Sequence, residues 1–359
     1  MTVLILLAKI FIMIGFLMTM AVLLTWVERK QSALMQDRIG ANRADIFGFR
    51  MLGLFHPLAD AIKLLTKEDF IPPSGDRFLH TLAPWIAFTT ALAAFAVIPF
   101  GPPVHLFGRE ITLQVADPPI GILFVFVITG LSIYGVVLAG WASGNRYGLL
   151  GALRGAAQTI SYEVSMGLSV IGLLMVFGSL SPAAISEAQG GLLFGVFPRW
   201  GILVQPIGFL IFFTAAIAET KRIPFDLPEG ESEIIGFFVE YSGMKFGMMW
   251  LGEFVEIVVM SGLIAVLFFG GWQVPYLTPA GFLFPGGGSI ALPEGIVLGL
   301  QIGAFLGKVV FFCWFQMLVR WTLPRFRYDQ LMRLGWKVLL PLSLLNILVT
   351  GMVLLTWGA

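Results

Sequence analysis

A run of ionisable residues between two strongly apolar segments is the first place where this sequence could do chemistry. Residues 218–233 contain Lys221 and Arg222, in a chain of which only 12% is charged. The same run holds five acidic positions, Glu219, Asp226, Glu229, Glu231 and Glu233. Charged groups at a bilayer face are costly to arrange and usually serve function. The run therefore predicts a functional loop at a membrane surface.

A second set of carboxyl groups lies inside or at the edge of apolar segments. Its members are Glu163, Glu240, Glu253 and Glu256. A carboxyl group in an apolar environment can titrate near neutral pH, and a chain of such groups can relay protons. For any one of them, simple pairing with an arginine or with a partner subunit is the structural alternative. Because the set gathers on one side beside the acidic loop, we interpret it as a proton path.

The aromatic residues near these charges suit an amphipathic ligand. Candidate walls are Trp26, Phe55, Phe225, Phe237 and Phe238. We find no pattern of a nucleophile–base pair, a metal-ligand set or a nucleotide loop, so we expect no covalent chemistry by this chain alone. Apolar walls with protonatable neighbours favour a head group on a hydrocarbon tail, as in a quinone.

The composition indicates a polytopic membrane protein. The chain of 359 residues is 58% hydrophobic, with a mean hydropathy of +0.90, whereas soluble domains are about a quarter charged. Its net charge of +1 gives no global field that would draw nucleic acid. The single cysteine, Cys313, excludes an intrachain disulfide and an iron–sulfur cluster ligated by cysteines of this chain alone. We expect no metal site from the scattered His56, His80 and His105.

The predicted fold is an all-α polytopic membrane protein with one transmembrane domain over residues 1–359. A membrane span needs about 20 mostly apolar residues. We predict eight transmembrane helices, at 2–26, 81–100, 119–142, 157–178, 202–219, 248–270, 296–319 and 337–357. Most lysines and arginines fall in the odd-numbered connections, while the even-numbered ones carry only Arg109 and Arg199. This asymmetry places the odd connections in the cytoplasm, or its equivalent, and both termini on the opposite side.

Three smaller features complete the expected architecture. In the first connection, Pro57 suits a first helical turn, and the 3.6-residue spacing after it predicts an amphipathic helix on the membrane surface; an ordinary solvated loop is the alternative. Alternating apolar residues around Gly108 predict a small outer-face hairpin. A glycine stripe in the seventh span predicts the close approach of a neighbouring helix. The stripe consists of Gly299, Gly303 and Gly307.

Three segments resemble one family, the membrane subunit of respiratory complex I called NADH dehydrogenase subunit 1, whose bacterial members are the H-type subunits of that enzyme. The first is WVERK at 26–30 followed by QDRIGANR at 36–43. The second is YGLLG at 147–151, Arg154 and AQTISYEV at 157–164, and the third is the loop at 218–233. The eight-span plan also fits, so the resemblance covers nearly the whole chain.

The resemblance implies a subunit of a proton-pumping NADH:quinone oxidoreductase that lines the path of quinone to an iron–sulfur cluster in a peripheral subunit. It implies ubiquinone or menaquinone as substrate, no cofactor bound by this chain alone, and FMN and iron–sulfur clusters in partner subunits. The partners would be the other membrane-arm and peripheral-arm subunits, quinone and lipid, without nucleic acid. The location would be the bacterial inner membrane, multi-pass, with periplasmic termini, rather than the mitochondrial inner membrane.

Residue by residue, the resemblance assigns two groups. The quinone entrance and peripheral contacts would involve Glu28, Arg29, Lys30, Arg38, Arg43, Arg222, Phe225 and Asp226. The acidic loop and proton path would involve Glu163, Glu219, Glu229, Glu231, Glu233, Glu240, Glu253 and Glu256. Ala41 and Lys221 depart from the pattern, where proline and asparagine are common. Both flank retained charges, so we expect tuning of function rather than its loss.

Two alternatives stay open at this point. One is the homologous subunit of a membrane-bound hydrogenase or of another complex I-like dehydrogenase, which the sequence separates poorly from the leading hypothesis. The other is a stand-alone secondary transporter, which carboxylates within spans permit. The two halves of the chain lack the matching broken helices of an inverted repeat, and this argues against a transporter.

Overall fold

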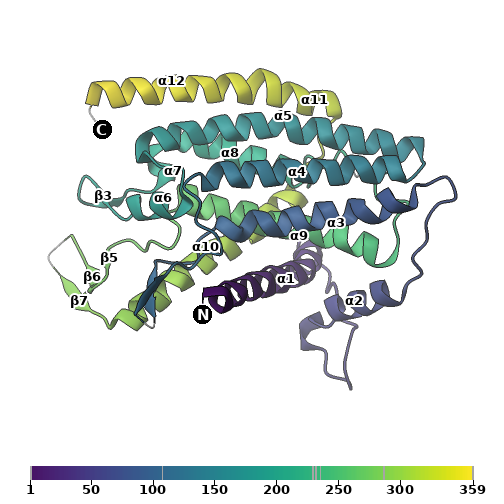
Figure 1. Cartoon of the computed structure of the whole chain (residues 1–359), viewed down its shortest axis with the longest axis horizontal. Helices are drawn as coiled ribbons and strands as arrows, with labels where there is room; N and C mark the ends of the chain where they lie inside the picture. Colours follow the sequence, from purple (N-terminus) through teal and green to yellow (C-terminus); the bar gives the residue numbers. More distant parts are fainter. Residues whose placement is uncertain are drawn as a thin grey trace.

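The fold is helical with little sheet, as the computed structural model in Figure 1 shows. The structure describes residues 2–106, 108–228, 230, 233–234, 236–285 and 288–357. Within these residues, seven helical segments are long and apolar enough to cross a membrane. They are α1 (Thr2–Met35), α3 (Arg77–Ala94), α4 (Gly121–Ala142), α5 (Arg146–Phe177), α9 (Gly243–Phe268), α10 (Glu294–Thr322), and the continuous run of α11 (Tyr328–Arg333), a π-helical turn (Leu334–Leu339) and α12 (Leu340–Trp357).

The fifth predicted span, 202–219, differs from the other seven because it is not one long helix. The chain forms a short helix, α7 (Gly201–Val204), and then α8 (Pro206–Glu219). Gln205 between them has a non-helical backbone, and Pro206 lacks the N–H that would continue the ladder. At 14 residues, α8 is about 21 Å long, shorter than a hydrocarbon core of about 30 Å.

Two helices extend beyond the predicted spans and carry candidate residues with them. The first predicted span ends at residue 26, yet α1 continues to Met35 and places Glu28 in its last turns. The fourth was predicted to begin at 157, yet α5 begins at Arg146, where Asn145 caps it by accepting a bond from the Tyr147 N–H at 2.9 Å. Charged residues that the hydropathy pattern assigns to connections therefore lie on rigid helices.

The shorter elements occupy the connections. A 3₁₀ turn (Met51–Gly53) precedes α2 (His56–Thr66), another (Phe95–Val97) follows α3, and α6 (Pro182–Ala188) follows α5. Strands β1 (Val104–Leu106) and β2 (Arg109–Ile111) pair antiparallel, with Val104 opposite Ile111. A second pair joins β3 (Leu192–Leu193) to β4 (Phe197–Pro198). A three-stranded sheet has the order β5 (Leu277–Thr278), β6 (Gly281–Leu283), β7 (Ser289–Ala291).

Helix α9 forms the centre of the structure. Every residue from Gly252 to Phe268 is buried, and the helix contacts α1, α3 and α10. In Figure 1, α3, α4 and α5 lie side by side, α12 covers the outer side of α5, and α1 lies on the opposite side of α9. An apolar helix that is buried all round is expected at a core. Two carboxyl groups on this helix, Glu253 and Glu256, are therefore held in the interior.

Close helix packing occurs at other glycines than those of the predicted stripe. A Cβ built on Gly135 of α4 would lie 2.8 Å from the Ala87 backbone nitrogen of α3, so only glycine allows this approach. By contrast, no described atom outside their own helix lies within 4 Å of a Cβ built on Gly299, Gly303 or Gly307. The prediction that this stripe admits a neighbouring helix is therefore wrong within this chain, because glycine spacing alone does not say which face a neighbour covers.

We expect Gly135→Ala to destabilise the chain by about 1–3 kcal/mol, because the added methyl meets backbone that cannot move away. Gly303→Ala is the matched control, since it adds the same methyl to open space in α10 and gains helix propensity of roughly 1 kcal/mol. Thermal unfolding of the detergent-solubilised chain, followed by circular dichroism, measures both. Equal melting temperatures for the two variants would contradict the packing assignment.

Candidate functional site

Four segments converge on one buried cluster of charges. They are the last turns of α1, the connection that follows α8, the first half of α9 and the end of α10. Arg222 is its centre: Nη1 lies 3.0 Å from Glu28 Oε2 and Nη2 lies 3.5 Å from Glu253 Oε2. Its guanidinium also lies 4.3 Å from the ring centroid of Phe254, a cation–π contact. The second oxygen of Glu28 pairs with Arg320 Nη1 at 3.2 Å.

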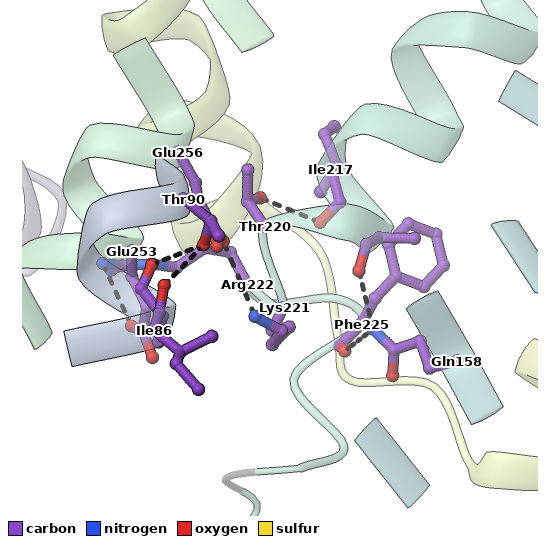
Figure 2. A network of polar contacts seen from close by, with 12 residues as sticks. Ile86, Thr90, Gln158, Ile217, Thr220, Lys221, Arg222, Phe225, Glu253 and Glu256 are labelled. Atoms are coloured by element: carbon purple, nitrogen blue, oxygen red, sulfur yellow. Dashed lines mark hydrogen bonds and ion pairs between the residues drawn. The ribbon is translucent and has the colours of Figure 1, made fainter. Parts of the chain in front are cut away.

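The neighbouring residue directs its charge to a different carboxylate. Lys221 has a left-handed backbone (φ 53°), and its Nζ lies 3.6 Å from Glu256 Oε2. Figure 2 shows Lys221 and Arg222 beside Glu256 and Glu253, which come from consecutive positions of one face of α9. Glu219, which is only 3% exposed, lies within electrostatic range of Glu256 and Lys221. The carboxyl groups of Glu219, Glu253 and Glu256 thus share the interior of the bundle with the cations of Lys221 and Arg222.

A polar clamp holds this connection against α5. Gln158 Nε2 donates at 2.8 Å to the carbonyl oxygens of both Ala218 and Phe225, as Figure 2 shows for Phe225. The Phe225 ring packs against Tyr162 and stacks on Phe326, with centroids 5.6 and 5.5 Å away. Because Gln158 bonds two carbonyls on either side of the 219–224 turn, it fixes where Lys221 and Arg222 point.

Asp226 leaves the turn next to Phe225 and is also buried. Its Oδ2 accepts a hydrogen bond from Arg325 Nη2 at 2.7 Å. Burial raises the pKa of Asp226 above its ordinary range, although the Arg325 charge acts in the opposite direction. The ionisation of Asp226 therefore depends on the guanidinium of Arg325 beside it.

A cavity of about 360 Å³ lies beside the cluster. Glu28, Arg29, Ser32, Arg38, Ala41 and Trp321 line it. Arg29 Nη2 pairs with Asp60 of α2 at 2.5 Å, so α2 lies at the edge of this cavity. Arg38 contacts Gln36 Oε1 at 2.7 Å and Ser32 Oγ at 3.4 Å, and Lys30 Nζ donates to the Ile39 carbonyl at 3.3 Å. Arg43 is exposed.

The remaining predicted carboxylates are dispersed around the cluster. Glu163 on α5 packs over Gly130 of α4, where a built Cβ would be 3.1 Å from its Oε1, and lines an open groove of about 350 Å³. It also lies within electrostatic range of Glu219. Glu233 pairs with Arg154 at 2.6 Å. Glu240 accepts a bond from Asn145 Nδ2 at 2.9 Å. Glu229 and Glu231 lie outside the described residues.

The structure adds residues that the sequence reasoning did not select. Arg320 at the end of α10 pairs with Glu28, Arg325 in the connection after α10 pairs with Asp226, and Gln158 orients the turn. The surplus of basic residues in the seventh connection was the available signal for the two arginines. Lys221, which the sequence indicated only as a charge of the loop and a departure from the family pattern, is the ion-pair partner of Glu256.

Comparison with known proteins identifies the family. A family model described as NADH dehydrogenase matches residues 8–351. The chain is 48% identical over 350 residues to an H-type subunit of the NADH-quinone oxidoreductase of Geobacter metallireducens, and the match covers 97% of this chain and 96% of the relative. The corresponding subunit from Thermomicrobium roseum is 46% identical over 352 residues, covering 97% and 95%. The one from Flavobacterium johnsoniae is 45% identical over 339 residues, covering 94% and 91%. The chain therefore belongs to the NADH dehydrogenase family and is a subunit of an NADH-quinone oxidoreductase.

Proposed function

We propose that this chain lines the path by which ubiquinone or menaquinone reaches an iron–sulfur cluster in a peripheral subunit, and that it couples quinone reduction to proton translocation. The observation that carries the proposal is the cavity of about 360 Å³ with Glu28 in its wall. Arg222 and Arg320 both converge on that carboxylate. A cavity with a few convergent charged groups beside an apolar bundle suits a polar head on a hydrocarbon tail.

The division of labour between this chain and its partners follows from the chemistry. Reducing a quinone to a quinol takes electrons and protons in equal number. This chain has one cysteine, Cys313, which is buried in α10, so cysteine-ligated clusters require ligands from another chain. We therefore assign FMN and the iron–sulfur clusters to partner subunits of the peripheral arm. The residues of this chain bind and orient the quinone and supply or move protons.

The donors around the cavity would hold the quinone head. Arg29 and Arg38 line it from the last turns of α1 and the loop after them, and arginine is a strong donor to oxygen acceptors. The tail would enter along α2, whose Leu58, Ile62 and Leu65 are exposed. An exposed apolar stripe on a short helix suits a position in the membrane surface, which is where we place α2.

The buried charges provide a route by which quinone reduction could be transmitted. A change of charge beside Glu28 alters the field at Arg222, which also pairs with Glu253. Glu253 and Glu256 are one helical turn apart, and Glu256 pairs with Lys221. Glu219 lies within electrostatic range of both Glu256 and Glu163. We propose that protons move along this series of carboxyl groups, and that Glu229, Glu231, Glu233 and Glu240 take part in the same path.

We also propose eight membrane crossings, with both termini periplasmic in a bacterial inner membrane. Seven crossings alone would put the termini on opposite faces. Together α7 and α8 cover residues 201–219, about 28 Å of helix, which is enough for a crossing with a break at Gln205. The side chain of Gln205 bonds Thr350 and Asn346 of α12 at 2.8 and 2.9 Å, so this break is supported inside the bundle. The β1–β2 pair would then lie on the outer face.

The test compares two electron acceptors in the assembled enzyme. We expect Glu163→Gln and Glu231→Gln to lower NADH:quinone activity by about tenfold or more, since each removes a proton-carrying group. NADH oxidation by ferricyanide, which bypasses this chain, should be unchanged. Glu294→Gln is the matched control, because Glu294 is exposed at the opposite end of the bundle. Unchanged quinone turnover in both test variants would contradict the proposal.

A further inference from the structure

A second, apolar cavity lies at the opposite end of the bundle from the charge cluster, between the N-terminal halves of α1 and α10. Its volume is about 320 Å³. Ile12 and Phe16 of α1 and Ile302 and Leu306 of α10 supply its walls. Their spacings of four residues place each pair on one helix face. Phe16 contacts Phe100 edge-to-face at 5.3 Å, which forms a further wall from the connection after α3.

A polar pocket of about 240 Å³ adjoins this cavity and shares Leu113 and Gln114 with it. Three carboxylates line the polar pocket, and all three are exposed at the surface. They are Glu110, Asp117 and Glu187. Lys9 lines the apolar cavity and brings a positive charge to the boundary between the two compartments. Its Nζ lies 3.2 Å from Oγ1 of Thr112, which lines the polar pocket. The two compartments together are therefore amphipathic.

The boundary between the compartments holds a polar side chain that forms no hydrogen bond with the described residues. Gln114 is 3% exposed, and neither its Oε1 nor its Nε2 has a hydrogen-bond partner among the described residues. Buried amides are normally bonded, so this side chain points to a ligand that supplies both a donor and an acceptor. The observation is independent of the cavity and of the charges around it.

We propose that these compartments bind one phosphatidylethanolamine molecule, with an acyl chain between α1 and α10 and its head group at Gln114. The phosphate would accept from Lys9 Nζ and Gln114 Nε2, and the ammonium would donate to Gln114 Oε1, to Asp117 and to the neighbouring carboxylates. The site has one cation and three carboxylates, so it disfavours a purely anionic head group. A quaternary ammonium prefers an aromatic face, and the aromatic residue of the polar pocket, Trp272, is only 1% exposed.

This lipid site is separate from the proposed quinone site and does not depend on it. None of the residues that line the two compartments lines the cavity at Glu28. A bound lipid would fill a gap between α1 and α10 and so join two helices that are distant in sequence. Failure of the quinone proposal would leave this inference standing, and failure of this inference would leave the quinone proposal standing.

The experiment uses the assembled complex in phosphatidylcholine vesicles doped with a phosphatidylethanolamine that carries a diazirine in one acyl chain. After illumination, mass spectrometry should find the probe on peptides containing Ile12, Phe16 or Ile302. Lys9→Met and Asp117→Asn should each lower this labelling by about tenfold, the effect of one charge-assisted hydrogen bond. Glu294→Gln, an exposed carboxylate outside both compartments, is the matched control and should label like the unaltered chain.

Competition in the unaltered complex keeps the test decisive if a variant fails to assemble. Unlabelled phosphatidylethanolamine should remove the signal, while phosphatidylglycerol and additional phosphatidylcholine should not. Equal competition by phosphatidylglycerol would overturn the assignment of the head group. Labelling that is absent from these peptides would overturn the site itself, as expected if a second copy of the chain or a partner helix covers the cavity.

Discussion

Replacing Arg222 with methionine is expected to lower NADH:quinone activity by about a hundredfold or more, the scale seen when one preorganised electrostatic donor is removed. Arg222 pairs with Glu28 and Glu253 and covers the Phe254 ring. Without it, the buried carboxylate of Glu253 and the half-buried carboxylate of Glu28 lose a shared cation, and breaking a buried ion pair from one side costs about 3–5 kcal/mol. The substitution would therefore alter Glu28 in the wall of the proposed quinone cavity. It would also remove the ion pair with Glu253 that connects this wall to α9.

Steady-state kinetics with quinone and with ferricyanide measure this expectation in the assembled enzyme. Arg222→Lys should fall between the methionine variant and the unaltered chain, because it keeps the charge but loses the planar fork that reaches two carboxylates. Arg77→Met is the control for an exposed arginine and should leave both activities unchanged. If the methionine variant assembled and reduced quinone at the normal rate, Arg222 would not belong to the site.

A double substitution at Glu256 and Lys221 separates proton transfer from simple charge pairing. Each single change, Glu256→Gln or Lys221→Gln, leaves a buried charge without the partner 3.6 Å away and should cost about 3–5 kcal/mol of stability. The double variant should recover most of this cost, because the two effects belong to one interacting pair. Proton translocation should nevertheless stay lost, since glutamine cannot carry the proton.

Melting temperature, quinone turnover and quenching of a pH-sensitive dye in reconstituted vesicles report the three quantities separately. If the double variant regained both stability and proton translocation, Glu256 would be no more than a structural partner of Lys221. The same design cannot be applied to Glu219 with equal clarity. That carboxyl group lies near Glu163 and Glu256 as well as Lys221, so no single compensating change isolates it.

Much of the plan was predictable because hydrophobic length is a local property. Seven of the eight predicted spans coincide with helices long enough to cross, since about 20 apolar residues must form a helix to satisfy their backbone in lipid. The exception, 202–219, is interrupted at Gln205 and Pro206. One glutamine and one proline lower the mean hydropathy of a window of about 19 residues only slightly, so that measure did not indicate the break.

The sequence by itself determined the membrane class, the family and the residue types of the site, because composition, apolar length and short motifs are all read along the chain. Only the tertiary structure decided which charges meet. Glu28 and Arg222 are separated by 194 positions and Asp226 and Arg325 by 99, yet each pair is in contact. Such pairings follow from how α1, α9 and α10 pack together. That packing rests on contacts between residues distant in sequence, such as the hydrogen bond of 2.9 Å that Gln316 Nε2 of α10 donates to Ser261 Oγ of α9, and not on any local pattern.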